Sequence, residues 1–320
     1  MSNEPSVTVL ITLRNSAGTI KRCIDSVLKQ DYPKSKYKIF VVDAFSTDGS
    51  YEILKRFGNK IKLYQIKGWP PKAYNWAIRK IKTDYIALID ADCVADKKWI
   101  RELVNGFKTN DILAVAGYCG TPKNASKLQK IIGRELESRF KEFQTYIPRA
   151  PTMNLCFKTE TSRKLKFDEN LRVSYDTDFG YRLTKIGKMY YNKNAVIYHY
   201  HRTSWKNFFK QQYLTGMFVP KLYMKHKGKT IGDNISKTTM IVQPHILNLA
   251  ILGLILSLIN PFYLNLAFIM LIILLLLFIE NLTKLVKRFS DIYWFLGLFI
   301  VRTVAWSIGL AVGVYRLLKK

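Results

Sequence analysis

The first 235 residues alternate between short apolar runs and longer segments whose apolar positions recur every three or four residues. Short β-branched runs predict buried strands, and the longer spacing predicts helices that bury one face. Such alternation predicts an α/β fold, a mainly parallel sheet with helices on both faces. The predicted strands are residues 7–12, 37–42, 61–66, 85–89, 112–118 and 195–198, and the predicted helices are residues 19–30, 50–57, 73–81, 99–107 and 126–146.

The pattern changes near residue 240, where long apolar runs replace the alternation. Residues 240–259 and 262–279 each have about the length of the roughly 20 helical residues that cross a ~30 Å hydrocarbon core. Asn260 and Pro261 between them predict a tight turn, so we expect a helical hairpin that spans a membrane. The chain is therefore expected to end in an all-α transmembrane region, residues 239–320.

A third apolar helix is predicted at residues 292–318. Its glycines Gly309 and Gly313 have the spacing that lets two helices approach closely. Arg302 in its middle is costly in lipid, so we expect it to pair inside the protein, to snorkel to the interface or to meet a lipid phosphate. The basic loop 280–291 is expected in the cytoplasm, and the hairpin then puts the N-terminal domain there too. A full third span would place the C-terminal lysines outside, so this helix is expected to span, to tilt or to lie at the interface.

Residues 204–238 connect the two regions and combine basic with aromatic residues at helical spacing. Ser204 is predicted to cap the first helix of this segment. Helices of this composition lie in the membrane interface, where each lysine near anionic lipid contributes on the order of 1 kcal/mol. The predicted organisation is a domain of residues 1–203, an interfacial segment of residues 204–238 and the membrane region.

The charge balance also indicates a membrane. The chain has 320 residues, with 51 Lys and Arg against 23 Asp and Glu, and a formal net charge of +28. This excess is typical of proteins that bind nucleic acid, anionic membranes or phosphate-rich ligands. The adjacent hairpin favours the membrane, and nucleic acid is not an expected partner. The four Cys form no CxxC pair, which predicts reduced thiols and no zinc site.

Two carboxylates, Asp90 and Asp92, directly follow the predicted strand 85–89. Their spacing puts both on one face if the strand geometry continues. Like charges this close repel unless they are neutralised, and a hard divalent cation does so with oxygen ligands. A solvated turn is the alternative. Thr12 and Asp43 also end predicted strands, and ligands of parallel sheets bind beyond the carboxyl ends of the strands.

Four motifs in this order resemble the family 2 glycosyltransferases of GT-A fold. They are VTVLITLRN at 7–15, VVDAFSTDGS at 41–50, KAYN at 72–75 and DAD at 90–92. The resemblance covers roughly residues 6 to 230. It implies that the enzyme transfers a sugar from a nucleotide donor (a UDP- or GDP-sugar) with inversion, and that Mg2+ or Mn2+ is its cofactor.

The resemblance implies a donor site. Asp92 would coordinate the metal, which neutralises the charge that develops on the departing nucleotide diphosphate. Asp90 would lie near the ribose and a metal-bound water, and so would also belong to the metal site. Lys72 would offer positive charge to the pyrophosphate, and Asp43 would accept hydrogen bonds from the base. The other implied substrate-binding residues are Thr12, Arg14, Asn15, Ser46 and Asn75.

The resemblance also implies an acceptor side. Asp176 would be the general base that takes the proton from an acceptor hydroxyl, or would orient an acceptor phosphate. His199 would complete the metal site, with His201 as the alternative. Asn154 would bind sugar or phosphate, or else stabilise a turn. Asp48 would contact the nucleotide or cap the helix that follows it.

The chain departs from the family pattern at three places. Tyr74 stands where the family often has Arg, Tyr175 stands where Glu is common, and residues 211–216 lack the Arg-Trp pair of processive synthases. We expect transfer to a lipid-linked acceptor, such as a polyprenyl phosphate or a lipid-linked saccharide. The expected location is the cell membrane, with the catalytic domain facing the cytoplasm. A small processive polysaccharide synthase and a non-catalytic nucleotide-sugar-binding membrane protein stay open as alternatives.

Overall fold

The computed structural model describes residues 4–229, 231–233 and 235–319. The chain divides into two compact units. The first contains the residues up to Lys123 together with Phe140–Tyr200, and the second contains Asn124–Arg139 and the residues from His201 onward. Residues Asn124–Arg139 therefore belong to the second unit, although in the sequence they lie between the two parts of the first unit. The boundaries predicted at residues 203 and 238 stay predictions.

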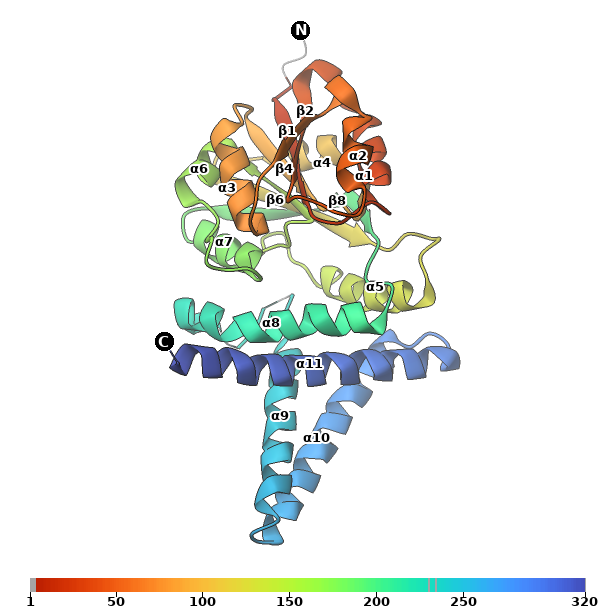
Figure 1. Ribbon diagram of the computed structural model, residues 1–320, viewed down its shortest axis with the longest axis vertical. Coiled ribbons are helices and arrows are strands. Elements are labelled where there is room, and N and C mark those ends of the chain that lie inside the picture. Colours follow the sequence, from red (N-terminus) through yellow and green to blue (C-terminus); the bar gives the residue numbers. More distant parts are fainter. Residues whose placement is uncertain (1–3, 230, 234, 320) are drawn as a thin grey trace. The chain divides into compact units, whose positions relative to one another are not determined.

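Among the described residues of the first unit, eight strands form one sheet in the order β3-β2-β1-β4-β7-β6-β8-β5 (Figure 1). β1 is parallel to β2 and β4, β2 to β3, and β6 to β8. β7 is antiparallel to β4 and β6, and β5 is antiparallel to β8. The predicted, mainly parallel sheet is confirmed. The strands are β1 (Val7–Leu13), β2 (Tyr37–Asp43), β3 (Lys62–Gln65), β4 (Tyr85–Ile89), β5 (Cys93–Ala95), β6 (Ile112–Gly120), β7 (Asn154–Lys158) and β8 (Lys188–His199).

Helices cover both faces of this sheet, as predicted (Figure 1). Leu10 of β1 and Leu88 of β4 pack in one cluster with Ala77 of α3 and Phe179 of α7. Val9, which alternates with Leu10 along the strand, faces the opposite side, where Figure 1 shows α1 and α2. The helices of this unit are α1 (Ile20–Leu28), α2 (Ser50–Lys55), α3 (Pro70–Lys80), α4 (Trp99–Asn105), α6 (Thr159–Leu165) and α7 (Tyr175–Leu183).

The register of the parallel strands brings their polar ends together. Leu13 at the end of β1 pairs with Asp43, and Asp43 pairs with Gln65 at the end of β3. β4 stops at Ile89, so Asp90 leaves the sheet at the same edge. Parallel strands have their carboxyl ends on one side, and this edge is therefore where a ligand is expected.

Two predicted elements have different bounds in the structure. Helix α5 (Lys127–Phe140) ends before residue 146, where the prediction was wrong. The segment after it bonds instead to β8: the Ile147 amide donates to the Met189 carbonyl, and the Tyr191 amide donates to the Thr145 carbonyl. β8 starts at Lys188, well before the predicted residue 195, and these hydrogen bonds are made by its first residues. The three-residue strand β5 was not predicted, since it is too short to show a pattern.

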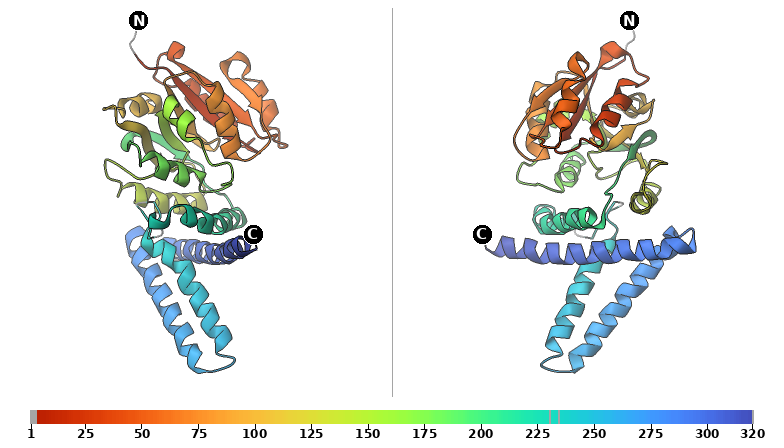
Figure 2. Two further views of the ribbon diagram at one scale, coloured as in Figure 1. Left: turned by 90° about the vertical axis from the view of Figure 1, so that its left-hand side faces the viewer. Right: turned by 45° about the vertical axis from the view of Figure 1, so that its right-hand side comes forward.

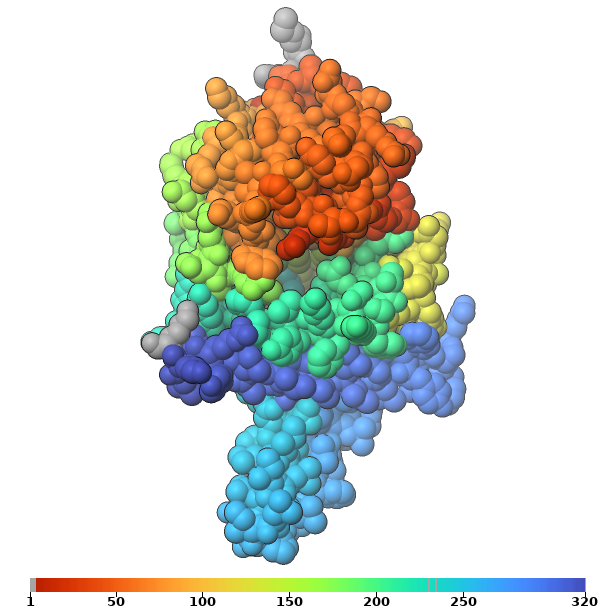
Figure 3. All heavy atoms as spheres, in the orientation of Figure 1, coloured from red at the N-terminus to blue at the C-terminus, as the bar shows by residue number. Residues whose placement is uncertain are grey.

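The second unit contains the predicted hairpin. Its two apolar helices run side by side around a tight turn (Figure 2). Leu258 is 88% exposed and Phe268 66% exposed, and Figure 3 shows the hairpin standing clear of the other helices of this unit. An apolar surface of this extent suits lipid better than water. The long helices here are α8 (Trp205–Lys225), α9 (Thr238–Leu256), α10 (Phe262–Leu285) and α11 (Ile292–Leu318).

Among the described residues, three helical stretches are long and apolar enough to cross a membrane: α9, α10 and Phe289–Leu318, which contains α11. α11 nevertheless lies alongside α8 and crosswise to the hairpin (Figures 1 and 2). A side chain at Gly309 would collide with the backbone oxygen of Tyr213 on α8, and Gly313 approaches α8 as closely. The predicted close approach is confirmed, and its partner is α8. The cap of α8 is also confirmed, because the Ser204 hydroxyl accepts a hydrogen bond from the backbone of Asn207 (3.3 Å).

Helix α5 contributes to the core of the second unit. Its residue Ile131 packs in one cluster with Phe208 of α8, Phe278 of α10 and Phe299 of α11. The apolar stripe that the sequence shows on α5 is therefore buried against the C-terminal helices. Although its sequence lies between β6 and β7, its packing belongs to the second unit.

Candidate active site

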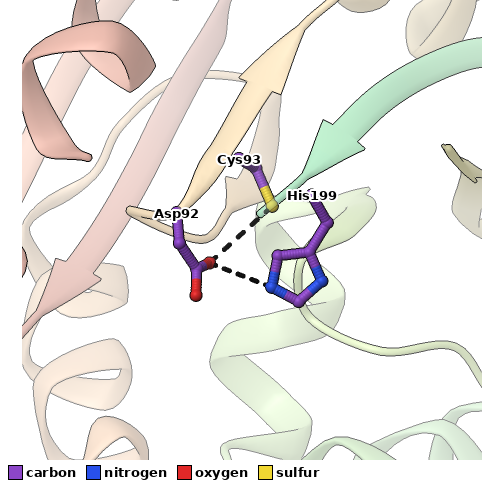
Figure 4. Close-up of side chains that lie close together, drawn as sticks. All are labelled: Asp92, Cys93 and His199. Atoms are coloured by element: carbon purple, nitrogen blue, oxygen red, sulfur yellow. Dashed lines mark hydrogen bonds and ion pairs between the residues drawn. The ribbon is translucent and has the colours of Figure 1, made fainter. Parts of the chain in front are cut away.

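Asp92 and His199 face one another in the first unit (Figure 4). Oδ1 of Asp92 lies 3.2 Å from Nε2 of His199. The antiparallel register of β5 and β8 pairs Cys93 with His199, and this pairing brings the imidazole to the neighbouring Asp92. Within the part of the chain that the structure describes, Asp92, Cys93 and His199 are the group whose ligand atoms lie close enough to hold a metal ion.

The donor set fits a hard divalent cation. A carboxylate oxygen and an imidazole nitrogen both suit Mn2+, and carboxylates suit Mg2+. Two ligands at roughly 2.1 Å from a cation and at right angles to each other lie ~3 Å apart, which is close to the observed separation. Burial, followed by the charges of Asp92 and Asp90, raises the pKa of the Cys93 thiol well above its ordinary value. Cys93 thus stays a thiol, whereas metals bind the thiolate.

The same pair is strongly coupled by charge. Burial disfavours the His199 imidazolium, but the Asp92 carboxylate outweighs burial and raises the pKa of His199 well above its ordinary value. A cation that takes this place would therefore displace a proton. His201, the alternative ligand, lies in the second unit, where its carbonyl accepts a hydrogen bond from Gln129 (2.8 Å).

Asp43 forms the centre of a corner at the end of β2. Its carboxylate is fully buried and accepts hydrogen bonds from the backbone and hydroxyl of Ser46 and from Gln65 Nε2 (2.9 Å). The Asn15 amide donates to Ser46 Oγ (2.9 Å), and Asn15 Oδ1 accepts from the Thr47 amide (2.9 Å). These bonds tie the loop after β1 to the loop after β2. The contact of Asp43 with a base stays a prediction.

Asp48 joins the same two loops. It accepts hydrogen bonds from the Ala17 amide (2.9 Å) and from the Ser50 amide (3.1 Å). Burial opposes its ionisation, but these bonds lower the pKa of Asp48. The residue at the N-cap position of α2 is Gly49, but α2 begins at Ser50, so the Ser50 amide bond gives Asp48 the capping contact that the sequence offered as the alternative. Its contact with the nucleotide stays a prediction.

Asn154 is committed to the protein interior. Its Oδ1 accepts from Trp99 Nε1 (2.8 Å), and its Nδ2 donates to the carbonyls of Tyr118 (2.9 Å) and Ala195 (2.8 Å). Both amide hydrogens are therefore used, and the residue holds β6, β7 and β8 together. The Asn154 backbone amide also donates to the Pro151 carbonyl (3.4 Å) and so closes the turn before β7. The contact of Asn154 with sugar or phosphate stays a prediction.

Asn75 is likewise committed to internal contacts. Its Nδ2 donates to the Phe167 carbonyl (2.8 Å) and to Glu169 Oε1 (2.9 Å), and its Oδ1 accepts from the Phe167 amide (2.8 Å). The side chain is buried. Asn75 therefore anchors α3 to the segment around Phe167, and its contact with substrate stays a prediction.

Lys72 and Arg14 are exposed near the carboxyl ends of the strands. Within the described residues, neither forms an ion pair. Helix α3 starts with Pro70 and Pro71, which have no N–H to donate. The Lys72 ammonium, rather than backbone amides, is therefore what this helix start would offer a phosphate, and the contact of Lys72 with the pyrophosphate stays a prediction.

Buried Tyr74 and partly buried Tyr175 stand where the family often has charged residues, and the structure brings the two tyrosines together. The rings of Tyr74 and Tyr175 have centroids 6.0 Å apart. Tyr74 has side-chain hydrogen bonds with Thr12 and Thr152, and Tyr175 has one with Thr152. Burial raises the pKa of both phenols far above the ordinary value, so both stay neutral. Two neutral, hydrogen-bonded phenols therefore stand at the positions where the family often has an Arg and a Glu.

Asp176 lies in the first turn of α7 beside these rings. Burial raises its pKa, against the opposing effects of the Arg149 guanidinium and the Thr177 amide, which donates to Oδ1 (2.7 Å). The charges of Asp90 and Asp176 both act on Tyr74. The end of β4 and the start of α7 are therefore close neighbours in the first unit.

Sequence reasoning missed several residues of this site. Gln65 ends β3 at the same edge as Asp43, so the strand-end rule could have found it. Thr152 and Arg149 lie in an irregular segment between α5 and β7, where no periodic pattern marks them.

The chain is similar to known glycosyltransferases. The sequence model of "Glycosyl transferase family 2" matches residues 8–171. Glycosyltransferase AglE of Haloferax volcanii is 31% identical over 121 residues, which are 36% of this chain and 40% of that protein. The dolichyl N-acetyl-alpha-D-glucosaminyl phosphate 3-beta-D-2,3-diacetamido-2,3-dideoxy-beta-D-glucuronosyltransferase of Methanococcus voltae is 23% identical over 224 residues, 64% of this chain and 70% of that protein. The chain thus spans less than half of the Haloferax relative.

A solved structure shares the fold. The mannosyltransferase PcManGT from Pyrobaculum calidifontis, in complex with GDP-Man and Mn2+, has a TM-score of 0.61 and 17% identity. The match covers 100% of this chain and 89% of that chain. At this identity the likeness concerns the fold alone. Together with the matched family model, it confirms the predicted GT-A type of fold.

Proposed function

The chain belongs to glycosyl transferase family 2, and on that premise we propose that it is an inverting, metal-dependent enzyme that moves one sugar from a UDP- or GDP-sugar to a lipid-linked acceptor. The observation that carries the proposal is the grouping of acidic side chains at one edge of the sheet. Asp92 lies beside His199, and Asp90 and Asp176 both act on Tyr74 between them. A metal-binding pair and a candidate base thus lie within one unit.

The donor side would hold the nucleotide diphosphate. A divalent cation bound by Asp92 and His199 supplies positive charge for the departing diphosphate. Lys72 adds a second positive charge from the first turn of α3. Asp90, at the end of β4, orients the ribose side of the donor. The neutral tyrosines Tyr74 and Tyr175 separate this side from Asp176 without adding charge.

The acceptor side centres on Asp176. The Thr177 amide occupies its Oδ1, and Oδ2 takes the proton of an acceptor hydroxyl. A raised pKa makes the ionised carboxylate a stronger base. The acceptor attacks the sugar carbon from the face opposite the diphosphate, so the anomeric configuration inverts. With a phosphate acceptor, Asp176 would orient the acceptor instead.

A lipid-linked acceptor is proposed because of the second unit. Its apolar helices are long enough to cross a membrane, and the name of the Methanococcus relative specifies a dolichyl N-acetyl-alpha-D-glucosaminyl phosphate, which is a lipid-linked sugar. An enzyme held at the bilayer meets a lipid-linked acceptor at high effective concentration. If the hairpin crosses the bilayer, α11 lies along its surface, because it runs crosswise to the hairpin. Lys284, Lys287 and Arg288 favour a cytoplasmic position for their loop.

The test is nucleotide release by the full-length protein in lipid nanodiscs. UDP and GDP are measured with a panel of donors, with Mn2+ or Mg2+, and with or without polyprenyl phosphate or a lipid extract. The proposal expects release that needs both the cation and the lipid and that is lost in Asp92→Asn. Release that EDTA leaves unchanged would contradict the metal role.

Two alternatives have their own outcomes in the same assay. Products with many sugars on one acceptor would favour a small processive synthase. Unchanged biological function in Asp176→Asn would favour a non-catalytic protein that binds nucleotide sugars.

A further inference from the structure

Phe45 combines two properties that are unusual for a phenylalanine. Its φ angle is 55°, in the left-handed region that strongly favours glycine. Its side chain is 42% exposed at the carboxyl end of β2, although phenylalanine is mostly buried. A bulky residue in this conformation is strained, and such strain persists where the surrounding structure enforces it.

The neighbouring hydrogen bonds supply that enforcement. Asp43 and Ser46 on either side of Phe45 bond to each other, and Ser46 also accepts from the Asn15 amide. Asn15 has a positive φ of 56° as well and accepts from the Thr47 amide. The loop is held at several points, so the outward direction of the Phe45 ring is a fixed feature of this corner.

The surface beside the ring is aromatic and positively charged. The Ile66 amide donates to the Asp43 carbonyl (3.0 Å), which fixes the end of β3 against β2. Lys67 follows, with its Nζ 5.5 Å from the centroid of the Phe45 ring, within cation–π range. The Asp43 carboxylate, by contrast, is 0% exposed and surrounded by protein donors. A ligand at this corner therefore meets a ring and an ammonium group before it meets the carboxylate.

We propose that Phe45 stacks on the base of the nucleotide donor, with Lys67 beside the ring. The inference rests on the proposed function and names the residue that recognises the donor. Every base offers a π-face, so stacking tolerates changes of base. It follows that Phe45 supports UDP and GDP alike, and that Asp43 serves to shape the loop that presents the ring.

The experiment measures UDP and GDP binding by calorimetry with Mn2+ on the detergent-solubilised full chain. Phe45→Ala and Phe45→Gly should weaken both nucleotides by a similar factor of roughly 5 to 100, and Phe45→Trp should retain binding. The donor KM should rise in proportion while kcat stays unchanged. Phe45→Gly should also unfold at the same or a higher temperature than the wild type, because glycine adopts a positive φ freely. Tyr146→Ala, at an exposed aromatic residue of the same unit, is the matched control and should bind as the wild type does.

Each contrary result has a distinct meaning. If the wild type binds and Phe45→Gly binds equally well, the stacking role is wrong and the proposed function stands. Loss of only one nucleotide would indicate an edge contact and would also overturn stacking. An equal loss in Tyr146→Ala would make the effect structural and overturn the inference. A wild type that binds neither nucleotide overturns this inference together with the proposed function.

Discussion

Arg302 of α11 donates a hydrogen bond to Glu135 of α5 at 2.7 Å, and both side chains are buried. Arg139 donates to the other oxygen of the same carboxylate. Burial opposes the charge on Glu135, but the guanidiniums of Arg139 and Arg302 hold its pKa below the ordinary value. The sequence left three possibilities open for Arg302, and the structure shows a partner inside the protein. One carboxylate thus pairs with two guanidinium groups in the second unit, of which that of Arg302 is buried and that of Arg139 is partly buried.

Glu135→Gln should lower the thermal midpoint more than Arg302→Met does. Without the carboxylate, the buried guanidinium of Arg302 and the partly buried one of Arg139 lose their counter-ion, and breaking a buried pair in this way costs about 3–5 kcal/mol. Without Arg302, Glu135 keeps Arg139 as its partner. Thermal unfolding of the detergent-solubilised protein measures both variants, and equal shifts would contradict this account.

Asp92→Asn and His199→Ala should each reduce turnover by more than roughly 100-fold, since even outer-shell changes at metal sites cost about 10–100-fold. His199→Ala should also need a higher Mn2+ concentration for half-maximal rate, because Asp92 then binds the cation without the imidazole. His201→Ala is the matched control, and its Mn2+ dependence should not change. If the wild type, His199→Ala and His201→Ala all depend on Mn2+ concentration in the same way, the cation binds elsewhere.

Asp176→Asn should change activity and stability in opposite directions. Turnover with a hydroxyl acceptor should fall by roughly 10²–10⁴-fold, because the general base is lost. The pKa of Asp176 is raised in the folded protein. The free energy of unfolding therefore falls as pH rises from the ordinary aspartate pKa to the raised pKa, and it stays lower at every higher pH. The amide carries no charge, so its thermal midpoint at neutral pH should lie above that of the wild type.

The same pKa shift predicts the acid side of the rate profile. Asp176 acts as a base only when ionised, so wild-type turnover should rise with pH through the raised pKa. Arg149 opposes the shift, and Arg149→Gln should therefore move the rise to higher pH. A rate that is flat across the acid range would contradict the assignment of Asp176 as the base.

Asn154→Ala should destabilise the first unit by at least about 3 kcal/mol, because each buried partner left unpaired costs about 1–3 kcal/mol. The partners are Trp99, Tyr118 and Ala195. The donor KM of the folded fraction should stay near that of the wild type. Asn194→Ala, at an exposed asparagine of the same unit, should leave the thermal midpoint in place. A raised donor KM with an unchanged thermal midpoint would instead support the substrate-binding role of Asn154.

Local pattern was sufficient for the scaffold. The runs around Leu10, Val42 and Leu88 predicted the central strands, because a buried strand is marked by its own residues. The long apolar runs likewise predicted both helices of the hairpin. Pattern failed for β5 and for the end of α5. In both places the backbone conformation depends on pairing with β8.

The sequence by itself determined that polar residues, among them Asp43 and Asp90, end neighbouring strands, since parallel strands place their carboxyl ends at one edge. Only the tertiary structure decided that Asn154 holds β6, β7 and β8 together and that α11 lies along α8. It also decided that Glu135 is the partner of Arg302, 167 positions away in the chain. Such contacts join distant segments, and the free energy of a pair depends on both partners and on their burial, which no local pattern of residues records.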